Sequence, residues 1–148
     1  MKLVRELLNY ERTINELECL IFTANSTIDR RGNLVMGAGN ALACKDAFPF
    51  VSNELGDQIE HLSEFNLHEV HVDRGTVMAF QTKINWKHKT PLYLLKNSIA
   101  ALKEKAETEC DRVFHLPCPG VNNGGMSVEK VMPLLECLPD NVIVYLAE

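Results

Sequence analysis

The sequence predicts an α/β domain of three layers, in which helices cover both faces of a mixed, largely parallel central sheet. Two observations carry this prediction. Short apolar runs rich in strand-forming residues alternate with amphipathic segments of helical spacing through most of the chain. No linker, repeat or low-complexity segment divides the 148 residues, so we expect one domain over residues 1–148.

Residues 1–17 have two interpretations. Their apolar residues recur every three or four positions, which favours a helix, whereas residues 1–5 alone would form a short edge strand. Residues 18–24 are an apolar run of strand formers, which predicts a buried strand. The polar residues after this run mark the end of the strand and the start of a loop.

A glycine segment, Met36 to Asn40, opens a run of helix formers that Phe48-Pro49 ends. Ser52 is the expected N-cap of a second helix. The apolar face of that helix consists of Leu55, Ile59 and Leu62.

Residues 69–73 and 76–82 predict the two strands of a hairpin, followed by a basic connection at 83–89. Thr90 is the expected N-cap of the next helix, with Pro91 at its first helical position. Its buried stripe is Leu92, Leu95, Ile99 and Leu102.

Residues 113–117 predict a strand that leads into a second glycine segment, Gly120 to Gly125. Ser127 is the expected N-cap of the last helix, and residues 142–146 close the chain as a buried strand. The inward face of this helix is Val128, Val131, Leu135 and Leu138.

Bulk composition excludes several classes of protein. The net charge of −5 argues against binding to nucleic-acid backbone or an anionic membrane. No apolar run approaches the ~20 residues of a membrane span, and charges near the N-terminus interrupt any signal-peptide pattern. The five cysteines show no CxxC spacing, so we expect reduced thiols and neither metal nor cofactor. These features predict a cytoplasmic protein.

The two glycine segments indicate an anion site. Glycine allows sharp turns and close approach of a ligand, and the first amides of a helix bind phosphate well. Neither segment has the spacing of a Walker loop or of a dinucleotide loop. An ordinary strand-to-helix turn is the alternative at Met36 to Asn40, and a flexible turn at Gly120 to Gly125. Segments that face each other across one crevice would suit a sugar diphosphate.

Several single residues near these segments have a functional and a plain interpretation. Asn25, at a strand end, can bond a sugar hydroxyl or form a turn. Lys83 has two interpretations: its ammonium contacts a phosphate or sugar oxygen of a ligand, or it belongs to a solvated basic connection. For Trp86 we favour a loop anchor over a cover for the crevice. For Cys118 we favour a space-filling thiol over a nucleophile.

With both segments placed, the chain resembles the macro domain family, and in particular its small stand-alone members in viruses and bacteria. The resemblance covers roughly residues 18–147. The residues that carry it are Thr23 to Ser26, Gly32 to Ala41, Phe80 to Lys83, Trp86, Leu116 to Gly120 and Asn122 to Met126.

The resemblance implies an α/β/α fold and a crevice for ADP-ribose or a derivative, with ADP-ribosylated proteins as a further class of partner. It implies a catalytic role for Asn25 and Lys83. The implied ligand-binding residues are Asn25, Val35, Met36, Gly37, Ala38, Gly39, Asn40, Thr82, Gly120, Val121, Asn122, Asn123, Gly124, Gly125 and Met126.

The activity that we favour is ADP-ribose binding with slow hydrolysis of ADP-ribose 1''-phosphate to ADP-ribose. The alternatives are a binding module without chemistry, a mono-ADP-ribosyl-protein hydrolase and a general mononucleotide binder. Lys83 matches the attacking lysine of relatives that cleave ADP-ribosyl-glutamate. The second loop of those relatives carries an aspartate where this chain has Asn123-Gly124-Gly125, which argues against lysine-based cleavage here.

Overall fold

A six-stranded sheet forms the centre of the computed structural model, which describes residues 1–147. The strand order is β1-β6-β5-β2-β4-β3, and every neighbouring pair is parallel except the antiparallel pair β3 and β4. The strands are β1 (Lys2–Val4), β2 (Glu18–Ala24), β3 (Leu67–His71), β4 (Thr76–Gln81), β5 (Val113–Pro117) and β6 (Val142–Tyr145). The predicted mixed, largely parallel sheet is confirmed.

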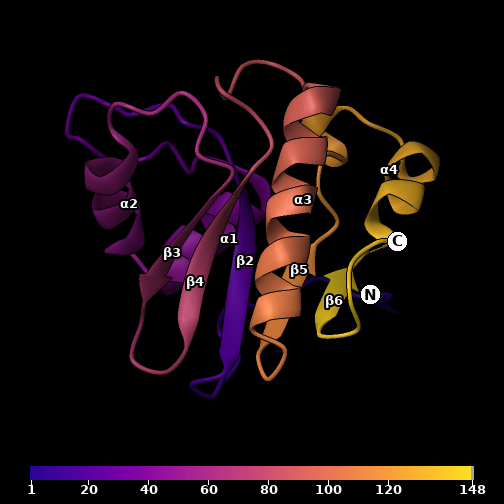
Figure 1. Ribbon diagram of the computed structural model, residues 1–148. Coiled ribbons are helices and arrows are strands. Elements are labelled where there is room, and N and C mark those ends of the chain that lie inside the picture. Colours follow the sequence, from indigo (N-terminus) through magenta and orange to yellow (C-terminus); the bar gives the residue numbers. More distant parts are fainter. Residues whose placement is uncertain (148) are drawn as a thin grey trace.

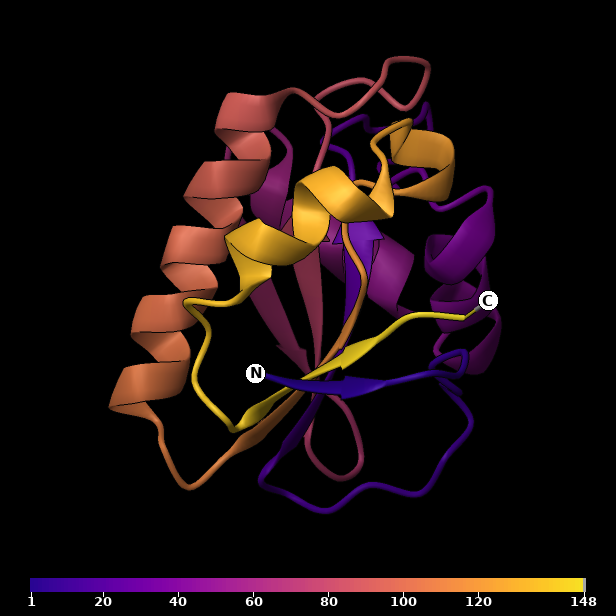
Figure 2. The same ribbon diagram turned by 90° about the vertical axis from the view of Figure 1, so that its right-hand side faces the viewer.

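Helices cover both faces of this sheet (Figures 1 and 2), so the predicted three layers are also confirmed. α3 and α4 lie on one face, and α1 and α2 lie on the other. The helices are α1 (Gly39–Ala47), α2 (Val51–Ile59), α3 (Leu92–Thr108) and α4 (Val128–Leu135), with a 3₁₀ turn, η1, at Asn122–Gly124.

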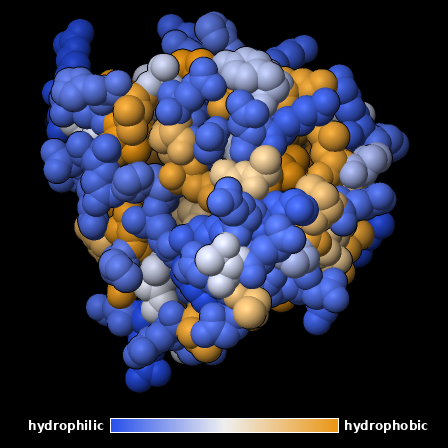
Figure 3. Space-filling view, in the orientation of Figure 1, coloured by the Kyte–Doolittle hydropathy of each residue, from blue (hydrophilic) through white to orange (hydrophobic). Residues whose placement is uncertain are grey.

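Strand periodicity divides the core into two clusters. Along β2, Cys19 and Ile21 belong to the cluster under α3 and α4, whereas Leu20 and Phe22 belong to the cluster under α1 and α2. All four side chains are fully buried. Successive side chains of a strand point to opposite faces, so one apolar run supplies both cores. The outer surface over α3 is mostly hydrophilic, with scattered apolar residues (Figure 3).

The N-terminal segment does not form the helix that its periodicity favours. Residues 2–4 form the edge strand β1, paired with β6, and the chain then runs irregularly to β2. The Oδ1 atoms of Asn9 and Asn15 accept hydrogen bonds from backbone N–H groups two residues later. Such bonds compete with helix formation. The buried apolar side chains of this segment still join the core beside α1 and α2, at Leu8, Tyr10 and Ile14.

Two predicted N-caps are wrong, and one is confirmed. Ser52 lies inside α2, which Phe50 caps, and Thr90 precedes the true cap of α3, Pro91. The Thr90 N–H instead donates to the Gly124 carbonyl, because the second glycine segment folds against it. Ser127 does cap α4, since its side chain accepts a hydrogen bond from the Lys130 N–H.

Two expected core positions are also wrong. Leu62 lies beyond the end of α2 and Leu92 lies in the first turn of α3, and both side chains are exposed. The remaining members of the two predicted stripes, Leu55, Ile59, Leu95, Ile99 and Leu102, are buried.

An ionic network lies at the amino end of β4. The glycine segments lie at the other end of the sheet, where β2, β4 and β5 have their carboxyl ends. Glu69 on β3 accepts hydrogen bonds from Thr76 and from Arg112. Lys105 on α3 contacts Glu69 at 3.1 Å and Glu109 at 2.9 Å, and Arg112 also donates to Glu109 at 2.9 Å. Burial alone would raise the pKa of Glu69, but the bonds from Arg112 and Thr76 outweigh it and hold the pKa at about 2.

No helix within residues 1–147 is long and apolar enough to cross a membrane. In the same part of the chain, no three His, Cys, Asp or Glu side chains come together as metal ligands. All five cysteines are free thiols, as predicted.

Candidate functional site

A cavity of about 770 Å³ lies at the carboxyl ends of β2, β4 and β5. β5 and β4 flank β2 on opposite sides, and the chain reaches them through separate connections. Where connections leave a strand toward opposite sides of a sheet, a crevice forms at the carboxyl ends of the strands, and ligands bind there in many α/β proteins. Residues 37–41 form one wall of the cavity and residues 120–124 another. The two glycine segments therefore share one cavity.

The first glycine segment ends at the start of α1, where no side chain caps the helix. α1 begins at Gly39, whose φ of +58° lies in the left-handed region that glycine adopts without strain. Ala38 occupies the N-cap and supplies no side-chain hydrogen bond, and the first turn contains no acidic residue. The first amides of α1 thus lack a side-chain partner at the positive end of the helix dipole.

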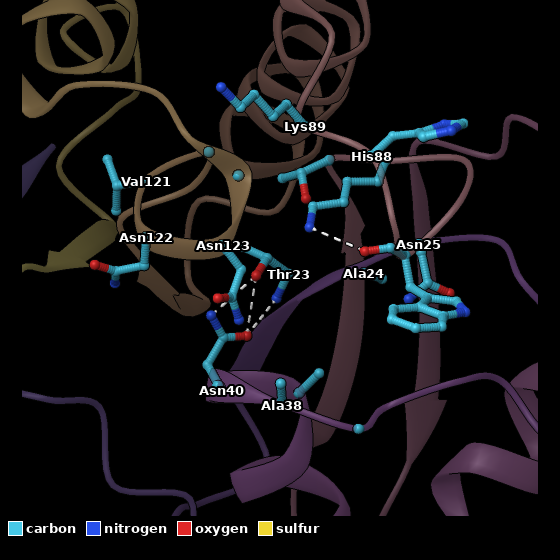
Figure 4. Close-up of a pocket in the computed structure, with 18 of the residues that line it drawn as sticks. Thr23, Ala24, Asn25, Ala38, Asn40, His88, Lys89, Val121, Asn122 and Asn123 are labelled. Carbon is cyan, nitrogen blue, oxygen red and sulfur yellow. Dashed lines mark hydrogen bonds between the residues drawn. The ribbon is translucent and has the colours of Figure 1, made fainter.

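Asn40 ties this helix start to β2. Its Oδ1 accepts from the Thr23 backbone N–H at 2.7 Å and lies 3.1 Å from Thr23 Oγ1. Its Nδ2 donates to Thr23 Oγ1 at 2.9 Å (Figure 4). Both polar atoms of the Asn40 carboxamide are therefore engaged with one residue of the sheet.

Asn25, just beyond the end of β2, also bonds to the backbone of neighbouring segments. Its Nδ2 donates to the Val35 carbonyl at 3.1 Å, and its Oδ1 accepts from the Thr27 N–H at 3.0 Å. The side chain is half-buried and lines the cavity. One N–H and one lone pair of the carboxamide have no partner among these bonds, and they are available to a sugar hydroxyl.

The second glycine segment needs its glycines. Gly120 has a φ of +79° and Gly125 a φ of +76°, and Asn122 also adopts a positive φ. The Met126 N–H donates to the Gly120 carbonyl at 2.9 Å, which closes the loop. A Cβ on Gly124 would lie 2.5 Å from Thr90 Oγ1, so a larger residue there would force the Thr90 side chain to move. The loop therefore packs against Thr90, which lies just before α3.

Basic residues of the connection at 83–89 border the cavity, and no Asp or Glu of the described residues does. Lys83 Nζ lies 3.4 Å from the Trp86 carbonyl, and burial lowers the pKa of its ammonium. Lys87, His88 and Lys89 also line the cavity, whereas no Asp or Glu in the described part of the chain does. In a protein of net charge −5, this distribution favours an anionic ligand.

Comparison with known proteins gives structural matches only. No family model matches the chain, and no curated protein sequence matches it. Several solved structures are similar to this chain, among them the following three. The macrodomain of Thermus aquaticus DarG matches at a TM-score of 0.72 and 24% identity, over 99% of this chain and 97% of that one. The macrodomain of Mycobacterium tuberculosis DarG matches at 0.71 and 22%, over 99% and 98%.

The chain has the macrodomain fold. A third match, Thermosipho africanus DarTG in complex with ADP-ribose, has a TM-score of 0.73 and 21% identity over 88% of this chain. This chain spans only 38% of that larger protein. The resemblance detected in the glycine segments thus corresponds to a shared fold along nearly the whole chain.

Most of the predicted site residues line the cavity of this macrodomain fold. They are Asn25, Val35, Gly37, Ala38, Gly39, Asn40, Thr82, Lys83, Gly120, Val121, Asn122, Asn123 and Gly124. Three others lie outside it. The Met36 side chain is in the core, Met126 packs against the opposite core cluster, and Gly125 faces the Lys89 side chain.

Sequence reasoning missed or misjudged several residues of the cavity wall. Thr23 faces it because β2 carries this side chain toward α1, which nothing local in the sequence signals. Trp86 is 51% exposed and lines the cavity, which favours the cover for the crevice over the loop anchor that we expected. Cys118 is a buried wall residue whose pKa burial raises to about 11, which agrees with a space-filling thiol.

Proposed function

We propose that this cavity binds ADP-ribose. The distal ribose would lie beside Asn25 and Lys83, and the diphosphate would pass between residues 37–39 and 120–124. The observation that carries the proposal is that both glycine segments, an uncapped helix start and several cations border one cavity of about 770 Å³. That volume lies within the range of cavities that enclose ligands of this size.

The wall chemistry supports a diphosphate. Backbone amides at a helix start and in a glycine turn bind phosphate oxygens without a charged side chain. Lysines at the rim add long-range attraction, and the absence of lining carboxylates among residues 1–147 removes a source of repulsion.

The reaction that we propose is slow hydrolysis of ADP-ribose 1''-phosphate. Loop amides would stabilise the charge on the transferring phosphoryl group, while Asn25 orients the ribose or the attacking water. No carboxylate is available in the described cavity to act as a general base. We therefore expect a low rate.

One observation favours a second reaction, the removal of ADP-ribose from a modified protein. Burial lowers the pKa of Lys83, which increases the fraction of free amine at neutral pH. The amine would attack C1'' of the distal ribose, and the carboxylate of a modified acidic residue would leave with the bonding electron pair. Water would then hydrolyse the bond between C1'' and the lysine nitrogen, which frees ADP-ribose and regenerates the amine.

Titration calorimetry tests the binding proposal. We expect micromolar affinity for ADP-ribose, about −8 kcal/mol, with much weaker binding of ATP and NAD. Absence of binding at millimolar ADP-ribose would refute the proposal. Equally tight binding of ATP would instead support a general mononucleotide site.

A single pair of variants separates the two reactions from simple binding. Lys83→Met should abolish release of ADP-ribose from a modified protein, because the nucleophile is lost. The same variant should slow phosphate release from ADP-ribose 1''-phosphate only about tenfold, through the loss of one cation near the phosphate. Lys96→Met, at an exposed position of α3, is the matched control and should change neither rate. Wild-type protein that binds ADP-ribose and turns over neither substrate would be a binding module.

A further inference from the structure

We infer that Asn40 is a positioning residue, which holds the first glycine segment in place through Thr23, and that this role, not a ligand contact, sets its effect on affinity. This inference rests on the proposed binding of ADP-ribose only for its affinity readout. The sequence places Asn40 among the ligand contacts, but the structure commits both polar atoms of its carboxamide to Thr23.

The inference starts from a gap in the sheet. The pairing of β2 with β5 covers Glu18 to Leu20 and their partners, and ends three residues before Thr23. The chain beyond β5 contains Pro119, which has no N–H, and turns into the second glycine segment. The Thr23 N–H donates to Asn40 Oδ1 at 2.7 Å, so a helix side chain completes the hydrogen bonding of β2.

Within residues 1–147, the N-cap of α1 makes no side-chain hydrogen bond that would hold the helix start. Ala38 caps α1 without a side-chain hydrogen bond, and Gly39 is free to adopt many backbone conformations. Asn40 is the first residue after Gly39, so its bonds to Thr23 fix the orientation of the helix start and of its open amides. Figure 4 shows the Asn40 and Thr23 side chains directed toward each other at the cavity wall.

The two glycine segments lie close together next to this clamp. A Cβ on Gly39 would lie 3.4 Å from Asn123 Nδ2, an ordinary van der Waals distance. A small displacement of the helix start would therefore change the width of the passage between the segments. Loss of the clamp should weaken binding of a diphosphate even though no ligand contact has been removed.

A double-mutant cycle distinguishes positioning from contact. Thr23→Val keeps the shape and the backbone N–H but removes the hydroxyl, and Asn40→Ala removes the whole clamp. We expect an approximately threefold loss of ADP-ribose affinity for Thr23→Val and an approximately tenfold loss for Asn40→Ala. The double variant should bind no more weakly than Asn40→Ala alone, because both changes break the same bonds. Thr23→Ser should retain wild-type affinity.

Hydrogen exchange tests the same inference without a ligand. The amides of Thr23 and Leu42, which donate to Asn40 Oδ1 and to the Ala38 carbonyl, should exchange at least fivefold faster in Asn40→Ala than in wild type, while the amides of β5 stay unchanged. Asp46→Ala, an exposed position on the same helix, is the control for a general loosening of α1. If wild type binds no ADP-ribose, the proposed function fails and the exchange rates alone decide the positioning role.

Two results would overturn the inference. Independent, additive losses of affinity for Thr23→Val and Asn40→Ala would show that Asn40 meets the ligand directly. Unchanged exchange of the Leu42 amide, which donates to the Ala38 carbonyl, in Asn40→Ala would show that the clamp does not order the segment.

Discussion

Replacing Glu69 by Gln removes the negative charge at the centre of the ionic network. The variant keeps the size of the side chain and leaves Arg112 and Lys105 with Glu109 as their remaining shared carboxylate. Hydrogen bonds in the folded protein hold the pKa of Glu69 at about 2, against an ordinary value of 4.5. A difference of this size corresponds to at most about 3 kcal/mol of stability at neutral pH.

Solvent reduces that maximum. The Glu69 side chain is 21% exposed, so screening and the flexibility of Lys105 lower the expected loss to about 2 kcal/mol. Urea denaturation at pH 7 measures this loss directly. In a thermal scan, the same loss corresponds to a fall in Tm of roughly 4–8 °C.

The pH dependence has a definite sign. A carboxyl group whose pKa is lowered by folding stabilises the protein above its unfolded pKa, and this contribution disappears as the pH falls through the folded pKa. The difference between wild type and Glu69→Gln should therefore be largest above pH 5 and should vanish near pH 2. Glu107→Gln, in an exposed pair with Lys103, is the control and should cost under about 0.5 kcal/mol. A difference under 0.5 kcal/mol at pH 7, or one that persists at pH 2, would refute the reasoning.

Two further predictions concern stability. Gly56→Ala should destabilise the protein by about 2–4 kcal/mol in urea denaturation, because the new Cβ would lie 1.9 Å from the Gly32 carbonyl oxygen. Helix propensity alone predicts a neutral or stabilising effect, and such a result would contradict this packing. Burial lowers the pKa of His115 below its ordinary 6.5, partly offset by its bond to Glu18, so the unfolded chain takes up this proton first as the pH falls. Wild-type stability should thus fall between pH 7 and pH 5 more steeply than that of His115→Gln, and parallel curves for the two proteins would exclude this role.

Patterns local in the chain predicted much of this fold. The apolar run of β2 is buried on both faces, and that condition leaves its signature in consecutive residues. Ser127 caps α4 through a bond to a residue three positions away, so the sequence alone identifies it. The glycine segments were also detectable, since positive φ at Gly39 and Gly120 demands this residue type wherever the turn lies in the fold.

Contacts between distant residues decided the rest. Thr90 does not cap α3: its Oγ1 is buried against Gly124, 34 positions away in the numbering, and its N–H donates to the carbonyl of that residue. The N-terminal segment forms a strand at its start because β6, at the other end of the chain, offers an edge to pair with. The Asn40–Thr23 clamp and the Glu69–Arg112 pair join residues 17 and 43 positions apart. Local sequence determines which backbone shapes and buried faces are available, whereas the partners of polar atoms depend on how distant elements pack, and only the tertiary structure decides them.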